Sequence, residues 1–150
     1  MPTQNLSDDV GVPLQHRSFG TFERIQSKGN SLTKDDPSSH PLREAILAAI
    51  DDKKGQDVLV LDLRDIPEAV CDFFVICSAD STTAVNAIAG GVEKDVKDAL
   101  SVHPLNVEGR QNARWVVIDY FDIVVHVFHR EARAFYQLEQ LWSDAPTEQR

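Results

Sequence analysis

Apolar positions first become periodic at residue 42, and their spacing is that of a helix. They recur at i, i+4, i+7 and i+8 and so share one helical face: Leu42, Ile46, Ala49 and Ile50. Pro41 fits the first turn, where no N–H is needed, with Ser39 or His40 as the N-cap. The lysines at 53–54 suit the negative end of the helix dipole, and Gly55 is expected to end the helix in the left-handed conformation.

Two continuous apolar runs follow, VLVLDL at residues 58–63 and FFVICS at residues 73–78. Both are short and rich in branched or aromatic side chains, which is typical of strands buried on both faces. Pro67 breaks the connection between them. The pattern therefore predicts two neighbouring strands in the interior of a sheet.

A long helix is predicted after the second strand, with Asp80 or Ser81 as its N-cap. Its apolar positions again share one face: Val85, Ile88, Val92, Val96 and Ala99. Gly90 and Gly91 fall in its middle, where each Gly costs about 1 kcal/mol relative to Ala. Close packing against the sheet would offset that cost.

The last third of the chain predicts a short strand, a hairpin and a helix. The short strand covers residues 105–108, and the hairpin strands cover 114–120 and 123–129, joined by a tight connection at 121–122. The final helix is expected to end at Ser143, with an inward face of Phe135, Leu138, Leu141 and Trp142.

The predicted order is therefore αββαβββα, an α/β or α+β domain in which a mixed sheet carries helices on one or both faces. Residues 40–143 form this one domain, which suits a chain of 150 residues. Residues 1–39 are rich in polar residues without periodicity and predict a disordered extension. Residues 144–150 are expected to form a polar tail.

Charge narrows the class of partner. The chain has a net charge of -9, and the part after residue 40 holds 19 acidic and 11 basic residues, a net charge of -8. Such a domain repels phosphate, which argues against direct binding of DNA or other nucleic acid. It suits docking on a basic protein, and ribosomal proteins are one class of such partners.

Other features exclude a membrane protein and a secreted one. No apolar run approaches the roughly 20 residues of a membrane helix, and the N-terminus lacks the basic and apolar regions of a secretory signal. The two cysteines, Cys71 and Cys77, are too few for a disulfide framework or a four-ligand zinc site. We expect a protein of the reducing cytoplasm.

Two candidate chemistries are weak. His126 and His129 lie three apart on an expected strand, so they point to opposite faces and do not share a metal; we expect His126 to pack on the sheet and His129 to start the helix. Cys77 lies inside an apolar strand, where a thiol behaves as a small hydrophobe. No metal or cofactor is predicted.

The loop CSADSTTA after the second strand resembles the phosphate-binding turn of nucleotidyltransferases. Those enzymes also hold metal ions on two carboxylates two residues apart on a strand, and this chain has no Asp-x-Asp. The loop is therefore expected to be an N-cap, and a nucleotide-using enzyme stands as the alternative function.

Aromatic residues gather on the predicted hairpin: Trp115, Tyr120, Phe121 and Phe128. They could anchor a protein interface, or they could all belong to the core. Strict alternation along the strand puts Trp115 and Tyr120 on opposite faces, so only strand twist could bring both to one partner. The residues alone leave both interpretations open.

Several runs in residues 42–143 resemble the ribosomal silencing factor family, also called Iojap or RsfS. They are KGQDVLVLDLR, DFFVICSADS, and VEGRQNARWVVIDYFDIVVHVFHREARAFYQLEQLW. The resemblance implies a nucleotidyltransferase-like fold without catalytic carboxylates, and a non-enzymatic function. It implies binding to the fourteenth protein of the large ribosomal subunit, on the face that meets the small subunit. The bound factor would block subunit joining and repress translation when nutrients are short, acting as a monomer or homodimer without a cofactor.

By position, Trp115, Tyr120 and Phe128 match the family's partner-contacting surface, and Asp119 and His126 complete the set. The chain departs from the family at Phe121, where the turn commonly has Gly. Positive φ disfavours Phe, so we expect the turn to differ and Phe121 to add an exposed apolar contact.

Overall fold

The computed structural model describes residues 40–150, so the prediction for residues 1–39 lies outside the described residues. Helices and strands alternate irregularly along this part of the chain. In order they are α3 (Pro41–Asp52), β1 (Gln56–Asp62), β2 (Phe73–Ala79), α4 (Thr82–Leu100), β3 (Asn106–Glu108), β4 (Trp115–Asp119), β5 (Ile123–His129), α5 (Arg130–Tyr136), α6 (Leu138–Leu141) and β6 (Thr147–Gln149). The chain thus has an α+β fold, as predicted.

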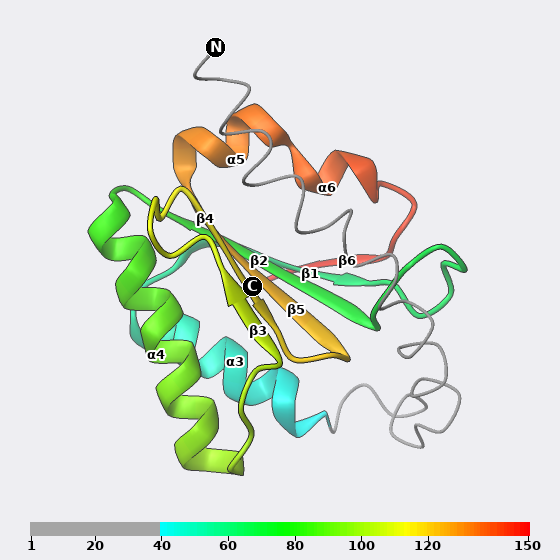
Figure 1. Cartoon of the computed structure of the whole chain (residues 1–150). Helices are drawn as coiled ribbons and strands as arrows, with labels where there is room; N and C mark the ends of the chain where they lie inside the picture. The colour runs from blue at the N-terminus through cyan, green and yellow to red at the C-terminus, as the bar shows by residue number, and fades with distance from the viewer. Residues whose placement is uncertain (1–39) are drawn as a thin grey trace.

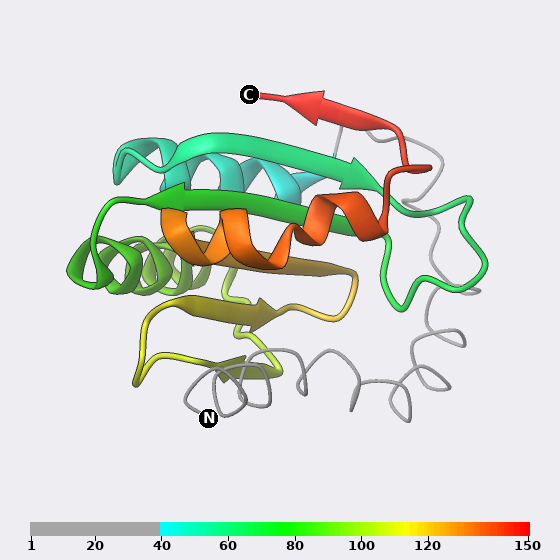
Figure 2. The same ribbon diagram turned by 90° about the horizontal axis from the view of Figure 1, so that it is seen from above.

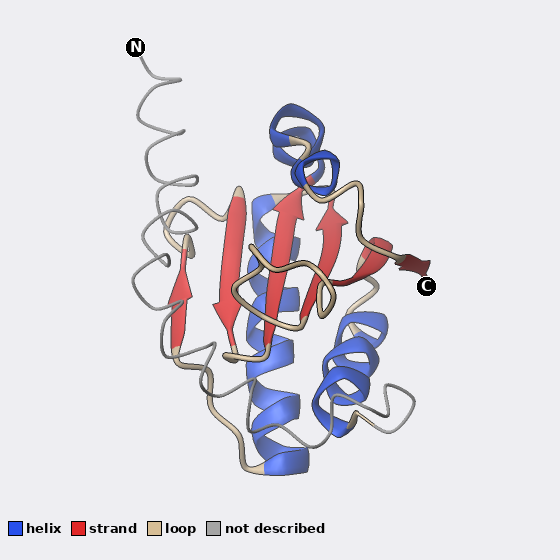
Figure 3. Cartoon of the chain, turned by 90° about the vertical axis from the view of Figure 1, so that its right-hand side faces the viewer, coloured by secondary structure: helices blue, strands red, loops and turns tan. Residues whose placement is uncertain are grey.

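The strands form one mixed sheet in the order β3-β4-β5-β2-β1-β6. β2 and β5 pair in parallel at its centre, and the other neighbouring strands pair antiparallel. Figure 3 shows the strands side by side with two helices behind them. The predicted hairpin is confirmed, because β4 and β5 are consecutive antiparallel neighbours.

Helices cover both faces of the sheet. α3 and α4 lie on one face, and α5 and α6 lie on the other (Figures 1 and 2). Side chains from alternate positions of each strand point to these two layers, and this separates the buried apolar residues into two clusters. Because helices cover both faces of the sheet, the side chains of the central strands are buried on both sides, and their sequences are continuous apolar runs.

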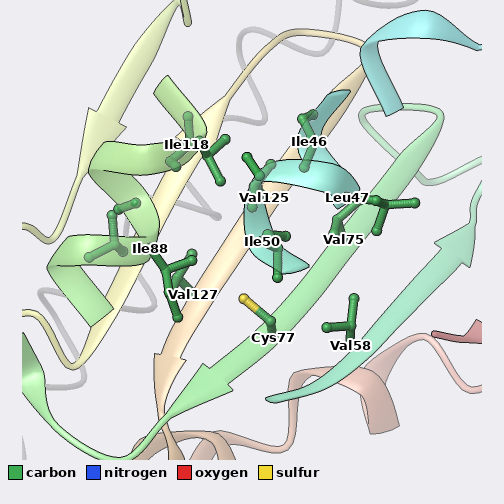
Figure 4. Packing of buried hydrophobic residues seen from close by; sticks show 14 of the residues in the cluster. Ile46, Leu47, Ile50, Val58, Val75, Cys77, Ile88, Ile118, Val125 and Val127 are labelled. Carbon is green, nitrogen blue, oxygen red and sulfur yellow. The ribbon is translucent and has the colours of Figure 1, made fainter. Parts of the chain in front are cut away.

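The larger core lies between the sheet and the pair α3–α4 (Figure 4). Ile46 and Ile50 of α3, Ile88 of α4 and Val125 of β5 meet there, and all four are at most 1% exposed. The helical periodicity predicted the buried face of α3 correctly at Ile46, Ala49 and Ile50. The predicted N-cap is also confirmed, because the His40 side chain accepts a hydrogen bond from the N–H of Arg43 at 3.3 Å. Ser81 caps α4 in the same way, from the N–H of Ala84 at 3.0 Å.

Two glycines act differently from the prediction. The left-handed residue after α3 is Lys54, with φ 63°, and Gly55 is not in that conformation. Gly55 is needed for space, because a Cβ there would lie 2.5 Å from Cγ2 of Ile50. Likewise Gly91 faces the side chain of Lys53 at the end of α3, so the close packing is between helices and not against the sheet.

The C-terminal region differs most from the predicted order. The expected single helix begins at Arg130, directly after its predicted start at His129, but Gln137 breaks it with φ 49°. The expected polar tail contains β6, which is exposed and pairs with β1 at the sheet edge. Three polar residues carry no alternation signal, and only the free edge of β1 gives them a partner.

Candidate functional site

The hairpin places three of the predicted site residues on the face that α5 covers. Trp115 on β4 pairs directly with Phe128 on β5, and His126 lies two residues before Phe128 on the same face. All three are buried. We call this set, with Tyr136 of α5, the hairpin face.

Trp115 is the centre of the hairpin face. Its ring stacks on Phe128 with centroids 4.7 Å apart and contacts Tyr136 at 5.2 Å. The indole Nε1–H donates a hydrogen bond to Nδ1 of His126 at 3.0 Å. An accepting Nδ1 means that His126 is neutral with its proton on Nε2. Trp115 is therefore fixed on two sides by rings and at its edge by a hydrogen bond.

The two histidines have the roles that the sequence predicted. His126 is fully buried within the sheet, with its ring 4.5 Å from that of Phe74. His129 is the N-cap of α5, where its Nδ1 accepts a hydrogen bond from the N–H of Glu131 at 3.2 Å. Each histidine therefore has a structural role, His126 in the packing of the sheet and His129 in capping α5.

Tyr120 lies on the opposite side of the sheet, in the core beneath α3 and α4. Alternation along β4 predicted this separation from Trp115 correctly. Burial, with a smaller effect of Glu93, raises the pKa of the Tyr120 hydroxyl well above its usual value. Within residues 40–150 this hydroxyl has no hydrogen-bond partner. Tyr120 thus packs in the core between the sheet and α3–α4, on the side of the hairpin opposite to Trp115.

The hairpin turn has a positive φ at Phe121, the position where the family commonly has Gly. Phe121 has φ 78°, and the N–H of Asp122 donates to the carbonyl of Tyr120 at 3.0 Å, which are features of a γ-turn. Asp119 holds the turn, since its Oδ1 accepts from the N–H of Phe121 at 2.8 Å. Phe121 thus has the positive φ that a large side chain disfavours, and these two hydrogen bonds maintain the strained backbone; a difference from the family's turn stays a prediction. Phe121 itself is half-buried.

Burial separates the predicted site residues into two groups. Trp115, Asp119, Tyr120, His126 and Phe128 are all at most 6% exposed, and the half-buried Phe121 is the sixth. For Trp115, Tyr120 and Phe128 the core interpretation of the aromatic residues is confirmed. Their role in binding a partner stays a prediction.

The structure adds exposed apolar residues that the sequence pattern assigned to the interior. Phe135 is 63% exposed and Leu141 is 75% exposed. The sequence pattern predicts both residues on the inward face of one continuous helix, and this prediction is wrong, since Gln137 divides the helix and both side chains are exposed. Phe135 packs edge-on against Tyr136 at 4.9 Å, so it adds an exposed ring beside the hairpin face.

The features considered for catalysis have structural roles. Ser81 of the CSADSTTA loop caps α4, as expected for a plain N-cap. Cys77 is buried, and burial raises the pKa of its thiol to about 12, which keeps it protonated and unreactive. In the described region, no group of three or more His, Cys, Asp or Glu side chains could hold a metal ion.

None of the helices within residues 40–150 is both long and apolar enough to cross a bilayer. The longest, α4, spans Thr82–Leu100 and carries charged residues on its exposed side.

A family model and two known proteins similar to this chain point to the same family. A family model described as "Ribosomal silencing factor during starvation" matches residues 36–150. The ribosomal silencing factor RsfS of Halalkalibacterium halodurans is 44% identical over 110 residues, covering 73% of this chain and 92% of that protein. RsfS of Bacillus subtilis is 46% identical over 99 residues, covering 66% of this chain and 82% of that protein.

A solved structure supports the fold. The chain superimposes on a crystal structure from Bacillus halodurans with a TM-score of 0.62 and 42% sequence identity. The match covers 72% of this chain and 96% of that one. The sheet and its helices are therefore those of the family.

Proposed function

The chain belongs to the ribosomal silencing factor family, and from this membership we propose that the exposed residues around its hairpin face, on α5 and at the hairpin turn, bind the fourteenth protein of the large ribosomal subunit. The contact would lie at the surface that meets the small subunit. The observation that supports this site is an exposed ring, Phe135, next to a rigid buried aromatic set.

As a member of this family, the protein is a ribosome-binding factor and not an enzyme. It binds the large ribosomal subunit and blocks the joining of the subunits under starvation. Membership excludes the nucleotide-using enzyme that the CSADSTTA loop suggested. We keep the nucleotidyltransferase-like classification of the fold, the cytoplasmic location and the monomeric or homodimeric state as parts of the proposal.

Charge supports a basic protein as the direct partner. The part after residue 40 has a net charge of -8, which repels ribosomal RNA and attracts Lys and Arg side chains. Opposite fields also speed the encounter of two proteins. The acidic domain would thus contact the exposed Lys and Arg side chains of a ribosomal protein and avoid the RNA phosphates around it.

The six predicted residues would contribute in two ways. Phe121, half-buried at the turn, can touch a partner directly. The other five are buried and would act by positioning the residues at the rim. Trp115 does this for Tyr136, because their rings are 5.2 Å apart and Tyr136 is itself half-buried. Aromatic residues held rigidly in this way lose little freedom on binding.

Inhibition then needs no chemical step. A factor seated at the intersubunit face occupies the space of the small subunit, so the two compete for one surface. The degree of inhibition follows the affinity and the concentration of the factor by mass action.

The test is a reassociation assay with purified large and small subunits, followed by sedimentation. The wild-type protein is expected to travel with the large subunit alone and to prevent joining. Phe135→Ser is expected to weaken binding on the order of tenfold, because an exposed aromatic anchor is lost. Phe135 is mostly exposed, so the variant should fold normally.

A matched control is Lys94→Ser on α4, on the other face of the sheet. Lys94 is exposed, and within residues 40–150 its ion-pair partner is Asp98, at 2.9 Å. It should bind like the wild type. Equal binding by the wild type and Phe135→Ser would refute the proposed face, and failure of the wild type to bind large subunits would refute the proposed function.

A further inference from the structure

A groove lies beside the hairpin face, between α6 and the loop that joins β1 to β2. In Figures 1 and 2 this loop and the end of α6 occupy the same end of the sheet. The groove has a volume of about 760 Å³, within the range of about 300–1,000 Å³ that is usual for binding sites. None of the residues singled out in the sequence as a binding site lines it.

The groove combines apolar side chains with exposed acidic ones, which we call its rim. The described residues that line it are Asp65, Ile66, Pro67, Glu68, Leu141, Trp142, Asp144 and Pro146. They include three carboxylates and no basic side chain. Leu141 is three-quarters exposed, while the Trp142 ring is held edge-on against Phe74 at 5.7 Å.

Both walls are preformed. The loop wall contains two successive turns, in which the N–H of Ile66 donates to Leu63 O and that of Ala69 donates to Ile66 O, both at 3.1 Å. The other wall is fixed where the N–H of Ala145 donates to the carbonyl of Trp142 at 2.9 Å. A preformed groove binds without first being ordered, which lowers the cost of binding.

The three rim carboxylates are available to a ligand. Asp65, Glu68 and Asp144 are exposed, and none has an ion-pair partner within residues 40–150. The nearby guanidinium of Arg64 is held by Asp62, with bonds of 2.7 and 2.9 Å. The rim therefore attracts cations and repels phosphate.

We propose that this groove binds a segment of a basic protein, with one apolar side chain seated against Leu141 and Trp142 and flanking Lys or Arg side chains on the carboxylate rim. The inference rests on the proposed function in one respect, that the segment belongs to the large ribosomal subunit. The groove is then a second contact, separate from Phe135 and the hairpin.

A site-specific photo-crosslinker tests the occupant. The full chain carrying benzoylphenylalanine in place of Leu141 is mixed with purified large subunits, irradiated, and analysed by mass spectrometry. We expect a crosslink to a ribosomal protein segment rich in Lys and Arg. The same crosslinker in place of Lys94, which is exposed on the other face of the sheet, should give no such product.

A charge-neutral variant tests the rim. Asp65→Asn, Glu68→Gln and Asp144→Asn together are expected to weaken binding to large subunits about tenfold, with a shallower dependence on salt concentration, because three exposed charge contacts are removed. The control neutralises Asp51, Asp52 and Asp98 on α3 and α4, which changes the net charge equally on the opposite face of the sheet. That control should bind with nearly wild-type affinity.

The outcomes separate this inference from the proposed function. Bound protein that crosslinks at Leu141 to RNA, or to nothing, overturns the groove and leaves the proposed function intact. Equal loss in the rim variant and its control also overturns the groove. A wild-type chain that does not bind large subunits overturns both.

Discussion

At the scale of single residues, a few backbone positions carry constraints that side-chain type alone does not reveal. Gly109 has φ 92°, and any Cβ there would collide with the carbonyl oxygen of Trp115, so the connection between β3 and β4 requires Gly at this position. Phe121 has a similarly positive φ but carries a large side chain. The hairpin turn therefore stores backbone strain beside the proposed binding face.

The strain at Phe121 predicts that Gly stabilises this position more than Ala does, the reverse of the usual order in a helix. Phe121→Gly should be more stable than Phe121→Ala by about 1 kcal/mol, because Gly adopts positive φ without a steric cost and both variants lose the ring. Urea unfolding of the two variants measures the difference in the free energy of unfolding.

The control pair is placed at Lys94, which is exposed in the middle of α4. There Ala should be more stable than Gly by about 1 kcal/mol, the usual order in a helix. If Ala were the more stable residue at both positions, the turn would not have the backbone described here.

At the scale of elements, one arginine attaches α5 to the sheet. The side chain of Arg133 donates to the carbonyl of Asp57 at 2.7 Å, to Oγ of Ser78 at 3.3 Å and to Oε2 of Glu139 at 3.2 Å. Asp57 lies in an irregular part of β1 and has φ 50°. Arg133 thus joins α5, the start of α6 and two strands.

We expect Arg133→Ala to lower the free energy of unfolding by about 2 kcal/mol, since a largely buried charged donor with three partners is removed. Arg130→Ala is the control. It lies in the same helix, its ion pair with Asp80 spans 3.6 Å, and both side chains are more than 60% exposed. That variant should stay within about 0.5 kcal/mol of the wild type.

Urea midpoints of the two arginine variants provide the comparison. Similar losses in both would mean that Arg133 does not fix α5. A larger loss in Arg133→Ala should come with weaker binding to large subunits, because α5 carries Phe135 and Tyr136.

At the scale of the whole molecule, the core between the sheet and α3–α4 seals two ionisable groups from water. Burial raises the pKa of the Cys77 thiol from its ordinary value of 9.0 to about 12, and it raises the pKa of the Tyr120 hydroxyl as well. The unfolded chain therefore releases these protons at lower pH than the folded one. The contribution of these two groups to the free energy of unfolding is therefore present below about pH 9 and is lost as the pH rises from 9 toward 12.

Cys77→Ala should remove part of that pH dependence. Between pH 8 and pH 10 the wild type is expected to lose about 1.4 kcal/mol more free energy of unfolding than the variant, which is one pH unit of linkage above 9. Urea unfolding at the two pH values measures this, and Tyr120 contributes equally to both proteins. Parallel losses would show that the thiol is not sealed in the folded state.

The sequence by itself determined the elements with strong local signals. Helical periodicity identified α3 and α4, continuous apolar runs identified β1 and β2, and the tight connection at 121–122 identified the hairpin. Alternation also separated Trp115 from Tyr120 correctly. These features succeed because the period of the side chains and the chemistry of caps and turns are set by neighbouring residues.

Only the tertiary structure decided the features that depend on distant partners. β6 exists because the free edge of β1 pairs with it, although its residues are polar and exposed. The helix is divided at Gln137, Phe135 and Leu141 are exposed, and Leu141 lines the acidic groove together with the β1–β2 loop. The burial of Trp115 and His126 likewise depends on α5 packing over the hairpin, a contact between segments that no local pattern contains.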